Sequence, residues 1–154
     1  MELEKIFFDM DGVLADFDRG VVEICGLEPI PQNKEKYVDS DYTELWKGVR
    51  EAGHFYNKLE LIQGAKKLFD TVYDKYGDKC ELLTGIPKPK RGVETAREDK
   101  IKWTRRVLSQ DVKINLVYRE EKPNYCKGMP FSPQAGQCRR RRSVPVLVGG
   151  RSEG

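Results

Sequence analysis

The chain has 154 residues, of which 38% are hydrophobic and 34% charged, and its formal net charge is +3. These values predict one compact globular domain that is long enough to bury a hydrophobic core. No apolar run approaches the roughly 20 residues that span a bilayer, and the N-terminus lacks the form of a signal peptide, so a cytoplasmic protein without a membrane partner is expected.

The basic balance comes from the C-terminal segment. Residues 129–154 hold five arginines and one acidic residue, whereas basic and acidic residues nearly balance in the rest of the chain. The overall charge therefore gives little support for a nucleic-acid partner. The cysteines form no Cys-X-X-Cys pair and the chain has one histidine, which favours free thiols over structural zinc. The cysteines are Cys25, Cys80, Cys126 and Cys138.

The first predicted element is a buried strand, residues 5–10, that leads into two aspartates. Because side chains alternate along a strand, Asp9 and Asp11 point the same way. In an open α/β sheet, ligands bind at this end of a strand, and Gly12 would let the chain turn close to a bound anion. An ordinary Asp-Gly turn would explain Asp11 and Gly12 but not Asp9, so we favour a functional site.

Helical segments follow between about residues 17 and 62. Residues 15–25 predict a helix and residues 27–40, which are polar and contain proline, predict a loop. Residues 41–44 have the form of a capping box and predict a helix that ends near Ala52. Together these segments resemble a helical cap inserted after the first strand.

Helices and strands then alternate. A helix is predicted from residue 64, a strand at residues 80–84, a charged helix at residues 93–108 and a strand at residues 112–118. This alternation predicts an α/β fold with a Rossmann-like parallel sheet. The side chains expected to face inward are Leu68, Phe69, Val72 and Tyr73 in the first of these helices, and Ile101, Thr104, Val107 and Leu108 in the second.

The run Asp-Met-Asp-Gly after an apolar strand resembles the first motif of the haloacid dehalogenase-like phosphohydrolases. The resemblance implies that Asp9 is the nucleophile that forms an aspartyl-phosphate, and that Asp11 is first an acid and then a base. A carboxylate is a weak nucleophile, so it needs a phosphoryl group whose charge is neutralised. The resemblance therefore also implies Mg²⁺ as cofactor, with Asp9 and Asp11 as its ligands.

Two further motifs of the family have counterparts. Residues 81–85 resemble the second motif, in which Thr84 and the backbone at Gly85 would hold a phosphate oxygen, although a strand that ends in Thr-Gly is also an ordinary turn. Lys122 follows the third predicted strand, where the family has a lysine that contacts both phosphate and nucleophile. Lys127 is the second choice for this role, and position alone separates either lysine from solvated surface.

Over residues 4–128 the chain is similar to one branch of the superfamily, the cytosolic-type 5′(3′)-deoxyribonucleotidases. The opening Asp-Met-Asp-Gly-Val-Leu-Ala-Asp-Phe and residues 55–65 carry this similarity. It implies that Phe17, Trp46 and Phe55 clamp a nucleobase above the phosphate site, because bases stack well on aromatic rings. The alternative is that these rings form the core of the cap.

After Gly128 the chain departs from the family. The fourth motif, an apolar strand that ends in two acidic residues, is absent, and residues 129–154 contain no aspartate. Residues 144–148 could form a strand, but Pro145 lies inside it. We hypothesise a change of reading frame near Gly128. The four arginines at 139–142 could instead bind nucleic acid, although such runs are more often solvated tails.

The expected organisation is a haloacid dehalogenase-like core of residues 1–16 and 63–128, a cap of residues 17–62 and a basic, irregular tail of residues 129–154. The expected activity is Mg²⁺-dependent release of phosphate from deoxynucleoside 5′-monophosphates. Two alternatives remain: a phosphatase for another small phosphate ester, and an inactive nucleotide-binding relative that lacks the fourth motif. The missing segment would also leave a sheet edge open.

Overall fold

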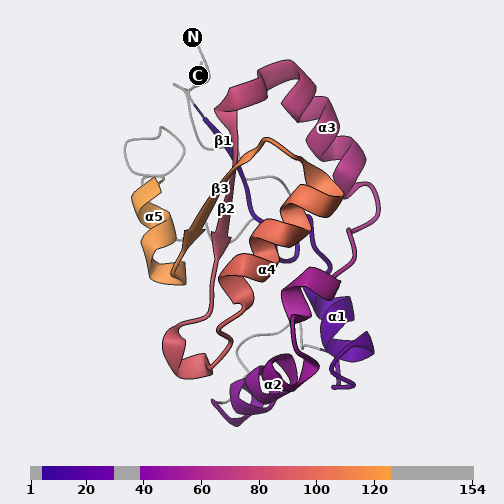
Figure 1. Cartoon of the computed structure of the whole chain (residues 1–154), viewed down its shortest axis with the longest axis vertical. Coiled ribbons are helices and arrows are strands. Elements are labelled where there is room, and N and C mark those ends of the chain that lie inside the picture. The colour runs from indigo at the N-terminus through magenta and orange to yellow at the C-terminus, as the bar shows by residue number, and fades with distance from the viewer. Residues whose placement is uncertain (1–4, 30–38, 126–154) are drawn as a thin grey trace.

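The computed structural model describes residues 5–29 and 39–125. The strands β1 (Ile6–Phe8), β2 (Cys80–Gly85) and β3 (Lys113–Val117) form one sheet in the order β1-β2-β3 (Figure 1). Both pairings are parallel, with Phe8 opposite Leu82 and Leu82 opposite Ile114. The prediction of an α/β chain with a parallel sheet is therefore confirmed.

The described residues also form five α-helices and several single turns. The α-helices are α1 (Phe17–Glu23), α2 (Asp39–Ala52), α3 (Ala65–Tyr76), α4 (Ala96–Trp103) and α5 (Lys122–Tyr125). The 3₁₀ turns are η2 (Phe55–Lys58), η3 (Gly77–Lys79), η4 (Pro89–Arg91) and η6 (Arg119–Glu121), and η5 (Thr104–Leu108) is a π-helical turn that extends α4.

The helices cover both faces of the sheet. Phe8 meets Phe69 of α3, with ring centroids 5.0 Å apart, and the next side chain towards the N-terminus, Phe7, meets Tyr125 of α5 at 6.1 Å. Because neighbouring strand residues point to opposite faces, α3 and α5 lie on opposite sides of β1. The helices α1 and α2 lie together at one end of the molecule, away from α3 (Figure 1).

The elements expected from residues 15–52 are present with shifted ends. Helix α1 begins at Phe17, because Asp16 caps it by accepting a hydrogen bond from the backbone N–H of Arg19 (3.2 Å). Helix α2 begins at Asp39, two residues before the expected capping box. Residues 30–38, the centre of the expected loop, lie outside the described residues.

Two of the side chains expected to face inward are exposed instead. Leu68 on α3 has 42% of its surface exposed and Ile101 on α4 has 38%, so both predictions are wrong. Helix α4 turns a different face to the core, formed by Ala96, Asp99, Lys100 and Trp103. The inward face of α4 therefore carries two charged residues, which a search for apolar periodicity assigns to solvent.

The segment expected to form a cap shares its core with the sheet. Phe55, Tyr56 and Leu59 are buried in the same hydrophobic cluster as Phe8. The indole N–H of Trp103 on α4 donates to the carbonyl of Leu59 (2.8 Å), which fastens this segment to α4. The division into core and cap stays a prediction.

The predictions on the cysteines and on the C-terminal segment can be compared with the structure only in part. Cys25 and Cys80 are free thiols, and burial raises the pKa of both. Within the described residues, no helix is both long enough and apolar enough to cross a membrane. Cys126, Lys127, Cys138 and the whole segment 129–154, with its arginines and its possible strand, lie outside the described residues.

Candidate active site

The candidate site lies at the carboxyl edge of the sheet, where the three parallel strands end together. Asp9 follows β1, Thr84 is near the end of β2, and Lys122 begins α5 shortly after β3. Residues that are far apart in the sequence are therefore neighbours here. This is the edge at which open α/β sheets bind their ligands.

Asp9 and Lys122, predicted as nucleophile and phosphate-binding lysine, are in direct contact. The Lys122 ammonium donates to Asp9 Oδ1 (2.9 Å), and both side chains are largely buried. The backbone N–H of Met10 donates to the same oxygen (2.8 Å). Within the described residues Asp9 Oδ2 accepts no hydrogen bond, so one oxygen of this carboxylate is fixed and the other is available.

Asp11 lies in a tight turn beside this pair. Gly12 has a φ of +76°, a value that favours glycine, and its N–H donates to the carbonyl of Ala15 (2.9 Å). Asp11 Oδ2 accepts a hydrogen bond from Lys100 (2.8 Å), whereas Oδ1 is buried with no hydrogen-bond partner. The second carboxylate thus also has one fixed oxygen and one without a partner.

Lys100 is the residue of this site that the sequence analysis missed. Its side chain is 0% exposed, and its ammonium donates to Asp11 Oδ2, to the Thr84 hydroxyl (2.8 Å) and to the carbonyl of Gly85 (2.6 Å). It also lies over the ring of Tyr56, 4.5 Å from the centroid. A signal was available: Lys100 is four residues after Ala96 and three before Trp103, so it shares the apolar face of its helix.

Thr84 and Gly85 lie at the predicted place, but their polar atoms contact Lys100. The Thr84 hydroxyl is fully buried. A Cβ on Gly85 would lie 3.6 Å from Cε of Lys122, an ordinary contact, so close packing does not demand glycine here. Their role in holding phosphate stays a prediction.

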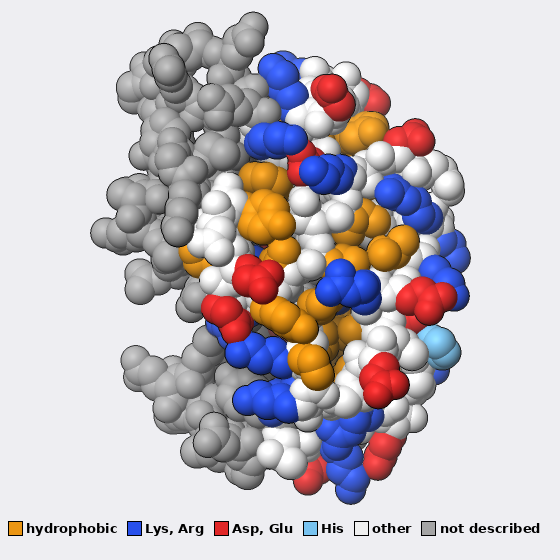
Figure 2. All heavy atoms as spheres, turned by 60° about the vertical axis from the view of Figure 1, so that its left-hand side comes forward, with side chains coloured by type: hydrophobic (Ala, Val, Ile, Leu, Met, Phe, Trp, Pro, Cys, Tyr) orange, Lys and Arg blue, Asp and Glu red, His pale blue; other side chains and the backbone are white. Residues whose placement is uncertain are grey.

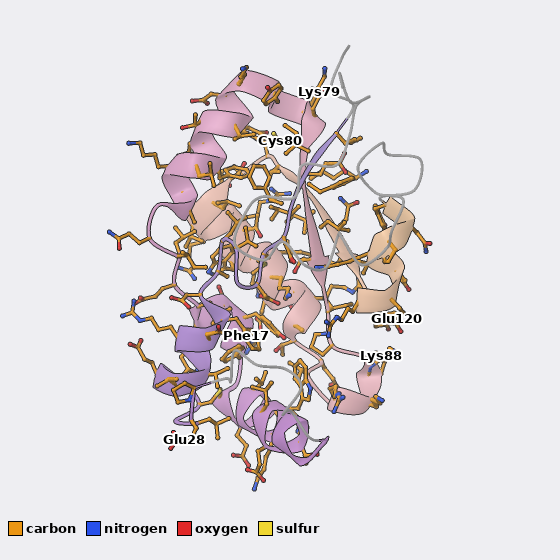
Figure 3. The ribbon with its side chains drawn as sticks, turned by 180° about the vertical axis from the view of Figure 1, so that it is seen from behind. Phe17, Glu28, Lys79, Cys80, Lys88 and Glu120 are labelled. Atoms are coloured by element: carbon orange, nitrogen blue, oxygen red, sulfur yellow. The ribbon has the colours of Figure 1, made fainter. Side chains whose placement is uncertain are left out.

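The three aromatic residues of the expected base clamp differ in exposure. Phe55 is 1% exposed and packs edge-on against Phe17, with ring centroids 5.4 Å apart, and Tyr56 is 6.2 Å from Phe17. Phe17, labelled in Figure 3, and Trp46 are half-buried. The guanidinium of Arg91 lies over the Trp46 ring at 5.7 Å. Phe55 is therefore a core residue that supports Phe17, while Phe17 and Trp46 keep exposed surface.

Tyr56 is a second residue that the sequence analysis did not single out. Burial, and after it the negative charge of Asp11, raise the pKa of the Tyr56 hydroxyl well above its ordinary value. The phenol therefore stays neutral, and its ring forms an apolar and aromatic wall against the Lys100 ammonium.

The oxygen atoms of Asp9 and Asp11 are of the chemical type that Mg²⁺ binds. This ion prefers carboxylate, carbonyl and water oxygens in octahedral geometry, and Asp9 Oδ2 accepts no hydrogen bond from the described residues. Among the described residues, no group of three or more His, Cys, Asp or Glu side chains is placed to hold a metal ion. The Asp9 carboxylate and the Asp11 backbone carbonyl would therefore supply two ligands, and water would supply the others.

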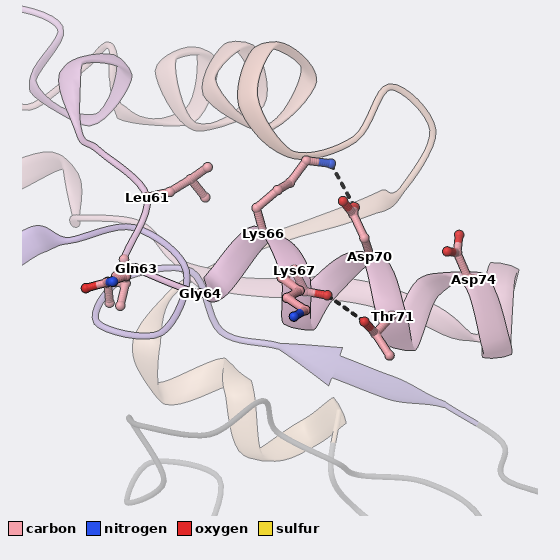
Figure 4. Close-up of a pocket in the computed structure, with 9 residues that line it drawn as sticks. Leu61, Gln63, Gly64, Lys66, Lys67, Asp70, Thr71 and Asp74 are labelled. Atoms are coloured by element: carbon pink, nitrogen blue, oxygen red, sulfur yellow. Dashed lines mark hydrogen bonds and ion pairs between the residues drawn. The ribbon is translucent and has the colours of Figure 1, made fainter.

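An open hollow of about 640 Å³ lies elsewhere, between residues 61–64 and α3 (Figure 4). Its polar groups bond to one another: Lys66 to Asp70 at 2.7 Å, and the Thr71 hydroxyl to the carbonyl of Lys67 at 2.8 Å. None of the residues around Asp9 lines it. We assign the site by its chemistry and not by the volume of this hollow.

The charges on the described surface are mixed. On the face in Figure 2, basic and acidic side chains alternate around apolar ones and do not separate by sign. Some of them pair across elements, as Lys88 does with Glu120 (2.5 Å), two residues that Figure 3 labels. The part of this face that the structure describes has no broad basic surface of the kind that binds a phosphate backbone.

Neither a scan of the chain against models of protein families nor a search of curated proteins gives a match.

Proposed function

We propose that this chain is a haloacid dehalogenase-like, Mg²⁺-dependent phosphatase that acts on deoxynucleoside 5′-monophosphates. The observation that carries the proposal is the pair of aspartates at the end of β1, each held by a different lysine. Two partly fixed carboxylates beside one buried and one largely buried ammonium group suit the transfer of a phosphoryl group, which requires positioning and neutralisation of charge.

In the first step Asp9 Oδ2 attacks phosphorus, while Oδ1 stays bound to Met10 N–H and Lys122. The bond from phosphorus to the leaving oxygen breaks, and protonated Asp11 gives its proton to that oxygen. In the second step water attacks the aspartyl-phosphate and loses a proton to Asp11. The bond between phosphorus and Asp9 breaks, and its electron pair returns to the carboxylate, so both aspartates regain their starting states.

Mg²⁺, when bound by Asp9 and the Asp11 carbonyl, would neutralise negative charge on the phosphoryl group. Lys122 provides a positive side chain next to the nucleophile Asp9. A base would stack on Phe17 and Trp46, with Phe55 as support beneath Phe17. We expect ribonucleotides to react more slowly, by about a hundredfold at most, because an apolar wall rejects an added hydroxyl only modestly.

One observation favours the first alternative function. Arg91 occupies one face of the Trp46 ring, which leaves less of that ring for a base. A phosphatase for another small phosphate ester would use the same aspartates and lysines and would not need the clamp. The second alternative, an inactive nucleotide-binding protein, would be stabilised by nucleotide without releasing phosphate.

The deciding experiment incubates the full chain with 2′-deoxyuridine 5′-monophosphate and Mg²⁺ and measures inorganic phosphate. We expect release that stops when the metal is chelated. Release from an aryl phosphate but not from nucleotides would favour the first alternative. A rise in melting temperature with nucleotide but no release from any ester would favour the second.

A further inference from the structure

The Lys100 ammonium has no hydrogen left for a substrate. A lysine ammonium has three N–H donors and no acceptor. Three acceptors surround Lys100 at 2.6 to 2.8 Å: Asp11 Oδ2, the Thr84 hydroxyl and the Gly85 carbonyl. Its side chain is fully buried and one side of it is closed by the Tyr56 ring. Lys100 therefore differs from Lys122, which has a single contact of this kind, to Asp9, among the described residues.

This arrangement fixes the Asp11 carboxylate. Burying a charged ammonium is unfavourable unless it is paired and fully hydrogen-bonded, and the partners of Lys100 come from β2, from η2 and from the turn after β1. The lysine therefore locks Oδ2 of Asp11 to the end of β2. Oδ1 is the buried carboxylate oxygen that has no hydrogen-bond partner among the described residues, so Lys100 leaves it unoccupied.

We propose that Lys100 is a positioning residue for the reaction, which holds Asp11 by Oδ2 so that Oδ1 gives its proton to the leaving oxygen. This inference rests on the proposed function. It assigns to Lys100 no contact with phosphate. The loss of rate when Lys100 is replaced must therefore depend on how much the leaving group needs a proton. If Lys100 bound phosphate instead, the loss would not depend on the leaving group.

The test uses Lys100→Met, which keeps the length of the side chain and removes the ammonium. The matched control is Lys102→Met on the same helix, an exposed lysine paired with Glu98 at 2.7 Å. Rates are measured with Mg²⁺ for a series of aryl phosphates whose leaving phenolates differ only in basicity. Binding of inorganic phosphate is measured in parallel by calorimetry.

For Lys100→Met we expect kcat to fall by about 10²- to 10⁴-fold with the most basic leaving group, the usual contribution of a general acid. The loss should be less than about tenfold with the least basic group, because that phenolate leaves without a proton. Phosphate affinity should stay within about threefold of the parent. Lys102→Met should change none of these quantities.

A second variant is needed in case the Lys100→Met protein unfolds because its Asp11 carboxylate has lost its partner. The double variant Asp11→Asn with Lys100→Met removes both charges, and replacing both partners of a buried pair is far milder than removing one. It should be no slower than Asp11→Asn alone, because a positioning residue acts only through its partner. Additive losses, equal losses across the leaving groups, or weakened phosphate binding would overturn the inference and leave the phosphatase proposal intact. A parent that hydrolyses no ester would overturn both.

Discussion

At the residue scale, the site is built from two aspartates that are held in the same way by different lysines. In each, one carboxylate oxygen accepts a lysine N–H, at 2.9 Å for Asp9 and 2.8 Å for Asp11. The lysines come from different elements: Lys122 begins α5, and Lys100 lies on the buried face of α4. The two carboxylates therefore have similar contacts that depend on two different helices.

The first prediction is that Asp9→Asn stops phosphate release while nucleotide binding remains measurable. The amide keeps the shape of the side chain but cannot attack phosphorus, so the rate should fall by several orders of magnitude, on the scale of losses seen when a covalent nucleophile is removed. The measurement is phosphate release from 2′-deoxyuridine 5′-monophosphate with Mg²⁺. Asp18→Asn, an exposed position on α1, is the control. Activity of Asp9→Asn within tenfold of the parent would rule out Asp9 as nucleophile.

The second prediction concerns Glu81, a buried carboxylate on β2. Burial alone would raise its pKa, but hydrogen bonds from Lys5 and Asn115, and the charges of Lys5 and Lys113, outweigh burial and hold the pKa below its ordinary value. The ionised form is therefore favoured by folding. Its contribution to the free energy of unfolding is present above the ordinary pKa and is lost as the pH falls through the lowered one.

Glu81→Gln should accordingly destabilise the chain at pH 7, by about 1.5–3 kcal/mol if hydrogen bonds to a charged group are lost. The difference from the parent should shrink as the pH falls below about 4.3, the ordinary value for glutamate. Urea unfolding at several pH values measures it, with the exposed Glu94→Gln as control. A difference that does not change between pH 7 and pH 3 would contradict the assignment.

At the element scale, α4 connects the sheet edge to the segment expected to form a cap. Lys100 contacts the end of β2, and one helical turn away Trp103 bonds to Leu59. Asp99 on the same face accepts a contact from His54 Nδ1 at 2.9 Å, at the turn after α2. His54 is the one non-glycine residue with positive φ in the described residues. Helix α4 therefore contacts both the end of β2 and the segment that contains Leu59.

The third prediction is that Trp103→Phe lowers the free energy of unfolding by about 1–3 kcal/mol, because the buried carbonyl of Leu59 loses its donor. Urea unfolding measures the change. The chain's other tryptophan, the half-buried Trp46, gives the control Trp46→Phe, since its indole N–H has no hydrogen-bond partner among the described residues. Equal losses for the two variants would show that the bond to Leu59 is unimportant.

The fourth prediction concerns the link between α2 and the loop after β2. Arg50 donates to the carbonyl of Arg91 (2.9 Å), whose guanidinium covers Trp46. If Trp46 also stacks on a base, Trp46→Ala should lower kcat/KM for 2′-deoxyuridine 5′-monophosphate by about 5- to 150-fold, the equivalent of one lost stacking contact of about 1–3 kcal/mol.

The control for this variant is an aryl phosphate that lacks a base, for which the loss should be small. Equal losses for nucleotide and aryl phosphate would place Trp46 in the structural core of this region. The substrate class would then be that of an unspecified phosphate ester.

At the scale of the whole molecule, the sequence predicts the α/β alternation, the parallel sheet and the meeting of Asp9 with Lys122. It does so because strand ends are marked by a change from apolar to polar residues, and parallel strands end at one edge. It does not predict Lys100, because hydrophobic periodicity assumes that charged residues face water. That assumption fails on α4, where Ile101 is exposed and Lys100 is buried. Both wrong expectations come from assigning the wrong face of this helix to the core.

The pairing of β1 within the described residues is a second property at this scale. Among the described residues, β1 pairs with β2 alone, although Ile6 and Phe8 are fully buried. The strand that leads into both aspartates therefore has one edge without a described partner. Asp9 and Asp11 would supply only two ligands for a metal ion, one carboxylate and one backbone carbonyl. Both observations agree with the absence of an apolar, acid-ended strand after Gly128 in the sequence.

The last prediction is that replacing residues 129–154 by an apolar strand that ends in Asp-Asp raises both stability and Mg²⁺-dependent turnover. The strand would cover the edge of β1 that has no partner among residues 5–29 and 39–125, and each 1 kcal/mol gained should raise the melting temperature by about 2–4 °C for a chain of this size. The two carboxylates would add ligands to Asp9 and Asp11, so turnover should saturate at lower Mg²⁺ concentration. Simple deletion of residues 129–154 is the control and should leave the melting temperature nearly unchanged. A sharp fall on deletion would mean that these residues are a working part of the fold, and the hypothesis of a changed reading frame would then be wrong.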